Sequence, residues 1–138
     1  MSSASDYLEN AMLSHLFGKS GLLMPASFYL ALATATIIDS HIGATLPEAS
    51  YTGYQRILSV PADWTTPSGG NISNAAVIQF ANNTGVSQII TDICTVMTGP
   101  ARLTAGNIHL KNALGGPITV DNGENVRFEI GAINWSAA

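Results

Sequence analysis

The sequence predicts a mainly β protein: an antiparallel β-sandwich or jelly-roll-like domain of about seven or eight strands, preceded by one short helix. Short segments that alternate apolar and polar residues recur along the chain, and Gly, Pro and Asn residues separate them. The one segment with clear helical spacing lies at the front. We expect residues 1–20 to form a helical arm and residues 21–138 the β-sandwich, together one compact domain.

Two end signals bound the predicted helix, which is about 13 residues long. Ser5 or Asp6 can cap its start, and Asp6 with Glu9 has the spacing of a capping box. Gly18 is a natural stop, because glycine readily adopts the left-handed backbone that ends helices. A helix of this length does not persist alone in water, so it must dock on another surface.

The predicted helix carries one apolar stripe at three- and four-residue spacing. Two docking surfaces fit this stripe: a neighbouring subunit or the shell of a particle, and the protein's own β domain. We expect the stripe to be the contact with a subunit or shell, and its residues are Leu8, Met12, Leu13, Leu16 and Phe17.

After Gly21 the period changes to two residues. In the segment 27–35, Phe28, Leu30 and Leu32 fall on one face and the residues between them on the other. Asp121-Asn122-Gly123 is a hairpin signal, because Asn-Gly suits the positive φ angles of a tight turn. The other predicted strands cover residues 54–60, 72–80, 86–97, 107–111, 118–120, 125–130 and 133–135.

Three aromatic residues lie in or near the predicted loops 39–53 and 63–70: Tyr51, Tyr54 and Trp64. Exposed rings on the loops of a β-sandwich can stack on sugars or fill a partner's pocket. We expect these rings to be ligand or partner contacts. The alternative for Trp64 is that it closes one end of the sandwich.

Charged residues make up only 10% of the chain, against a usual share of about 25%. The uncharged remainder of the surface is either polar or covered by other subunits. A net charge of −4 with scattered basic residues argues against a nucleic-acid partner. The most apolar stretch, residues 22–38, is interrupted by Pro25 and several hydroxyl residues, and we predict a buried strand there rather than a membrane span.

No catalytic, metal-binding or cofactor motif is present, and we expect no enzyme activity, metal ion or cofactor. The three histidines, His15, His41 and His109, are far apart and lie in different predicted elements. The single cysteine, Cys94, lies in an apolar run and is predicted to be a small buried hydrophobic residue.

Several short segments together resemble small virion structural proteins of tailed bacteriophages, of the kind described as tail fibre or structural proteins. They are residues 5–10 (SDYLEN), 15–17 (HLF) with Pro25, 28–32 (FYLAL), 53–56 (GYQR), 70–74 (GNISN) and 115–124 (GGPITVDNGE), followed by Phe128, Gly131 and Ala132. This resemblance extends over most of the chain. It implies a virion component that is assembled in the cytoplasm of the host bacterium.

The function that we expect is a non-enzymatic capsid decoration (cement) protein, used in many copies. It stabilises the shell through symmetric contacts with itself, as a homotrimer, and with virion proteins such as the major capsid protein. The alternative is a tail-fibre or tail-tip component that contacts the host surface, with a host glycan as its ligand. Neither function involves nucleic acid or a membrane.

Overall fold

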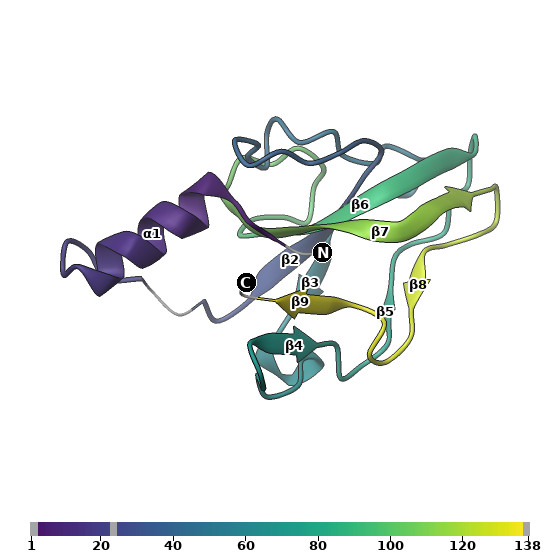
Figure 1. The fold of residues 1–138 in the computed structure, drawn as a ribbon. Helices are drawn as coiled ribbons and strands as arrows, with labels where there is room; N and C mark the ends of the chain where they lie inside the picture. Colours follow the sequence, from purple (N-terminus) through teal and green to yellow (C-terminus); the bar gives the residue numbers. More distant parts are fainter. Residues whose placement is uncertain (1–2, 23–24, 137–138) are drawn as a thin grey trace.

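The computed structural model describes residues 3–22 and 25–136. This part of the chain contains one α-helix, and its strands pair antiparallel, which confirms the mainly β class with an N-terminal helix (Figure 1). The elements are β1 (Ser3–Ala4), α1 (Asp6–Leu16), β2 (Phe28–Ala33), β3 (Ile57–Ser59), the short 3-10 helix η1 (Pro61–Asp63), β4 (Asn71–Ser73), β5 (Ile78–Gln79), β6 (Gln88–Val96), β7 (Ile108–Val120), β8 (Arg127–Phe128) and β9 (Asn134–Ser136).

A five-stranded sheet in the order β1-β7-β6-β2-β3 forms the centre of the molecule. The predicted two-residue period of β2 is confirmed. Leu30 and Leu32 lie on one face, opposite Thr95 and Ile93 of β6. Both faces of β2 are covered, since its last four residues are all buried.

Each face of the main sheet packs against a different layer, an arrangement like a sandwich. On one face the two small ladders, β4-β9 and β5-β8, enclose the larger core with aromatic residues such as Phe80 and Trp135. On the other face the loop between β2 and β3 covers a smaller core (Figure 1). That smaller core contains Ala31, Ala33, Ile37, Leu46, Cys94, Val96 and Ile108.

The ends of α1 follow the predicted signals. Ser5 is the N-cap, and its Oγ accepts a hydrogen bond from the Leu8 amide at 3.3 Å. At the other end Gly18 adopts a φ of +68°, where a side chain would be strained, and its amide donates to the His15 carbonyl. α1 therefore begins and ends where local chemistry predicts, within one or two residues.

The predicted strand 72–80 is two strands, β4 and β5, because Asn74 interrupts it. The Asn74 side chain is buried, and its Nδ2 donates to the carbonyls of Ala76 and Glu129 at 2.9 and 2.8 Å. Its Oδ1 accepts from the Ile133 amide. These side-chain hydrogen bonds replace a regular ladder and send the chain to a new partner strand.

Conversely, the two predicted strands 107–111 and 118–120 are one, the long β7. Gly115, Gly116 and Pro117 lie within it. Beyond Lys111, β7 pairs with β6 on one side only within the described chain. A proline on a free sheet edge removes no ladder hydrogen bond, so the strand continues through it.

Candidate functional site

The base of α1 is fastened to the edge of the main sheet. The Ser5 amide donates to the His109 carbonyl at 2.9 Å, and the Ser5 hydroxyl donates to the Ile108 carbonyl. The rings of Tyr7 and His109 stack with 5.4 Å between their centroids. The first turn of the helix is thus held by β7, and the remainder extends away from the body (Figure 1).

The outer half of α1 exposes the stripe that the sequence singled out. Leu13, Leu16 and Phe17 are 54%, 73% and 75% exposed, and Met12 is also exposed. Only Leu8, nearest the body, is half-buried. No residue of α1 is fully buried. The stripe does not dock on its own β domain beyond its first turn, although it is the most apolar part of the helix.

An apolar groove of about 750 Å³ begins beside Leu8. Its walls come from both layers of the fold: Phe28 of β2 and Leu110 of β7 from the main sheet, and Ile72, Trp64 and Trp135 from the opposite side. The indole of Trp64 packs against the ring of Phe28, with 5.9 Å between the ring centroids. We call this the α1 groove, defined by Leu8, Phe28, Trp64, Ile72, Leu110 and Trp135.

The polar atoms around the α1 groove are largely used within the protein. The indole N–H of Trp64 donates to the Ser59 hydroxyl at 2.7 Å, and the Thr95 hydroxyl accepts from the Leu110 amide at 3.0 Å. Burial lowers the pKa of His109, so its ring is neutral at neutral pH. The buried indole N–H of Trp135 has no hydrogen-bond partner within the described chain. The groove therefore offers apolar surface with little charge and with this one indole N–H unused among the polar atoms named here.

The structure corrects the expectation for two of the three aromatic residues. Tyr51 and Tyr54 are buried core residues rather than loop contacts. Their rings meet edge to face at 5.4 Å, and Tyr54 stacks on Phe80 at 6.2 Å. Because the segment between β2 and β3 folds over the sheet instead of away from it, these rings present no face to a ligand. Trp64 alone of the three reaches a surface groove.

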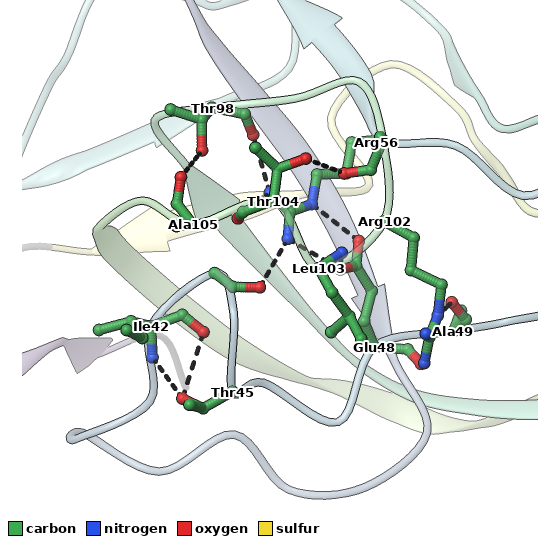
Figure 2. Close-up of polar contacts among 12 residues, drawn as sticks. Ile42, Thr45, Glu48, Ala49, Arg56, Thr98, Arg102, Leu103, Thr104 and Ala105 are labelled. Atoms are coloured by element: carbon green, nitrogen blue, oxygen red, sulfur yellow. Dashed lines mark hydrogen bonds and ion pairs between the residues drawn. The ribbon is translucent and has the colours of Figure 1, made fainter.

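A buried ion pair between Glu48 and Arg56 was not predicted from the sequence. The guanidinium of Arg56 donates through Nε and Nη2 to the two carboxylate oxygens of Glu48, each at 2.8 Å (Figure 2). It also donates to the carbonyls of Gly43, Thr98 and Thr104. One arginine thus joins the loop after β2 to the loop between β6 and β7.

The carboxylate of Glu48 is equally well satisfied. It accepts from the Tyr54 hydroxyl and from the Leu103 amide, both at 2.8 Å. Burial raises the pKa of Tyr54, and the negative charge of Glu48 raises it further. For Arg56, burial lowers the pKa, but the hydrogen bonds and charge of Glu48 outweigh burial, so the net change is upward. The two side chains are fully paired with one another and with their surroundings, which suits a structural brace.

One feature of the sequence could have indicated the brace. Arg56 is the only charged residue in the predicted strand 54–60, in a chain with few charges. The sequence could not show its partner, which lies in a loop.

No group of three or more His, Cys, Asp or Glu side chains in residues 3–22 and 25–136 is placed to hold a metal ion. His15 and His41 each accept a backbone amide through Nδ1, from Leu22 and Ile38. Cys94 is buried. Across the described chain, no helix has the length and apolar character that a membrane span requires. The surface feature of this part of the chain that stands out is the exposed outer half of α1 beside the α1 groove.

Comparison with known proteins agrees with the resemblance seen in the sequence. The family model described as "Podophage GP4 fiber I protein gp80" matches residues 3–136, a range that includes α1 and every strand. No curated protein matches the chain. Since this match covers nearly the whole chain, the protein belongs to the podophage GP4 fiber I protein gp80 family of bacteriophage structural proteins.

Proposed function

We propose that this protein is a non-catalytic component of a bacteriophage fibre, and that it joins itself and neighbouring virion proteins through α1 and the α1 groove. Its family is one of phage fibre proteins, which makes it a virion structural protein. The observation that carries the finer proposal is the exposure of Leu13, Leu16 and Phe17 on a helix whose base is firmly held. A large apolar surface of this kind is typical of an assembly contact.

The low charge of the chain supports an assembly role. The chain has fourteen charged residues: five Lys and Arg, and nine Asp and Glu. Two of the fourteen, Glu48 and Arg56, form the buried brace and therefore add no charge to the surface. Uncharged polar surfaces can meet across an interface without the cost of desolvating ions. We propose a homotrimer as the assembled unit, which is one of the closed cyclic arrangements that homo-oligomers adopt.

Capsid decoration is the second candidate. The observation that favours it is the absence of repeats in the sequence, whereas a fibre shaft is usually repetitive. In this role the same apolar stripe on α1 would contact the shell, with the major capsid protein as the partner.

The two candidates differ in copy number and position. Quantitative mass spectrometry of purified particles, with gold-labelled antibody imaging, tests both. Roughly three to eighteen copies at the tail supports the fibre proposal, whereas hundreds of copies over the capsid contradict it and favour decoration.

Contact with the host belongs to the fibre proposal. Trp64 is the candidate residue, the expected ligand is a host-surface glycan, and such a ligand would occupy the α1 groove in place of a helix. Glycan-array binding that is lost in Trp64→Ala and retained in Val86→Ala, a change at an exposed position that does not line the groove, would support this contact. Equal binding by the two variants would argue against it.

A further inference from the structure

We propose that the outer half of α1 from one copy of this protein docks in the α1 groove of a second copy. This inference rests on the proposed function and names the partner of its contact surface. Each copy then donates its helix to one neighbour and receives a helix from another. The occupant is the outer part of the chain's own apolar stripe: Leu13, Leu16 and Phe17.

The helix cannot fill the groove of its own chain. The groove begins beside Leu8, and Phe17 lies nine residues later, which places it roughly 13 Å further along the helix axis. The exposure of Leu16 and Phe17 confirms that neither residue is covered by its own body. Donor and acceptor surfaces therefore exist in the same molecule. The backbone of α1 runs straight out from the body and carries the outer residues away from it (Figure 1).

The chemistry of the groove selects an apolar occupant. Its walls are aromatic and aliphatic, and the nearby polar atoms of Trp64 and Thr95 are already bonded within the protein. A nucleic acid or a charged peptide would find no charged side chain to pair with. The stripe on α1 matches this surface, because Leu13, Leu16 and Phe17 carry no polar side-chain atoms.

The areas fit a weak contact that is repeated around an assembly. At about 200 Å² per large apolar residue, Met12, Leu13, Leu16 and Phe17 together expose on the order of 500 Å². The walls of the groove expose a smaller area than this, so one contact buries less than about 1,000 Å² in total, the size of a weak or transient interface. A groove of about 750 Å³ has the size that accepts several large side chains.

The size of the helix gives a further reason for docking. An isolated helix of 11 residues is marginal in water. In this chain only the first turn is supported by β7, and three large apolar side chains extend beyond it. Docking on a neighbour supplies the packing that the outer turns lack.

Cysteine cross-linking tests the contact directly. The natural chain has one thiol, Cys94, and it is buried, so it does not interfere. Two variants are purified separately and mixed under mild oxidation: Phe17→Cys on the helix and Thr66→Cys at the groove. Both positions are exposed, so neither change disturbs the core. Any disulfide between the two variants joins different molecules by design.

The matched control replaces the groove variant with Val86→Cys, at a position that is 86% exposed and does not line the groove. We expect the Phe17→Cys and Thr66→Cys mixture to form cross-linked dimers at least ten times faster than the control mixture. Adding Leu16→Ser to the helix variant should reduce that rate at least fivefold, because it removes an apolar contact without unfolding an exposed site.

Two results would overturn the inference. The first is equal cross-linking rates for the groove and control positions. The second is preferential cross-linking of Phe17→Cys with itself, which would mean that helices pack on helices. The experiment needs no virus particle. A negative cross-linking result therefore does not contradict a fibre location. Likewise, a capsid location found in particles does not contradict this contact between copies.

Discussion

Removing Arg56 should destabilise this protein more than any surface change. In Arg56→Met the carboxylate of Glu48 remains buried and keeps only the hydrogen bonds from Tyr54 and Leu103. Three carbonyl oxygens also lose their guanidinium donor. Breaking a buried ion pair from one side costs about 3–5 kcal/mol, because an uncompensated charge is left behind. We expect a decrease of this size in the free energy of unfolding.

Urea unfolding, followed by tryptophan fluorescence, measures the effect. With a urea dependence of about 1–3 kcal/mol per molar, the midpoint should fall by about 2 M. The matched control is Arg127→Met. Arg127 also pairs with a glutamate, Glu129, but their side chains are 49% and 69% exposed. Solvent and salt screen such a pair, so the control midpoint should be unchanged within error.

The double variant Glu48→Gln with Arg56→Met separates charge from packing. We expect it to be more stable than Arg56→Met alone, because the buried charge is gone. A midpoint for Arg56→Met equal to that of Arg127→Met would refute the assignment of Glu48 and Arg56 as a brace. A double variant less stable than the single one would refute the electrostatic explanation.

Three further outcomes are expected. Gly43→Ala should lower the free energy of unfolding by about 1–3 kcal/mol in urea titrations, because a Cβ would overlap the Thr104 carbonyl oxygen, whereas Gly116→Ala, with open space around it, should cost nothing. Burial raises the pKa of Cys94, so its thiol should not react with Ellman's reagent in the native protein but should react fully in guanidinium chloride; fast native reaction would contradict the buried position. Burial also raises the pKa of Tyr51 to about 12, above the ordinary value of 10.0. The native state then holds the proton more tightly than the unfolded state, so stability should fall as the pH rises from about 10 to about 12; a urea midpoint independent of pH in that range would show that Tyr51 is not buried.

Local signals predicted the elements because local chemistry forms them. The end signals at Ser5 and Gly18 needed only neighbouring backbone groups, and α1 begins and ends beside them. The alternation in residues 27–35 predicted β2 with its correct faces. The predictions were wrong where a distant partner decided the outcome. Asn74 splits a predicted strand through bonds to Glu129 and Ile133, far along the chain.

The turn at residues 121–124 shows the same division. Gly123 adopts a φ of +86°, as the Asn-Gly signal requires, and the Glu124 amide donates to the Asp121 carbonyl at 3.0 Å. The expected hairpin does not form, however, because the strand after the turn, β8, pairs with β5 rather than with β7. Turn chemistry is local, but the choice of partner strand depends on which apolar faces can be covered.

By itself the sequence determined the mainly β class, the single capped helix, its apolar stripe and the resemblance to phage virion proteins. Each of these depends on residues close together in the chain or on the residue types alone. Tertiary structure decided that Tyr51 and Tyr54 are core residues, that Glu48 meets Arg56, and that the stripe on α1 stays exposed beside a groove. The physical reason is that burial is a property of the whole packed chain: an apolar side chain is covered only if another surface is free to cover it.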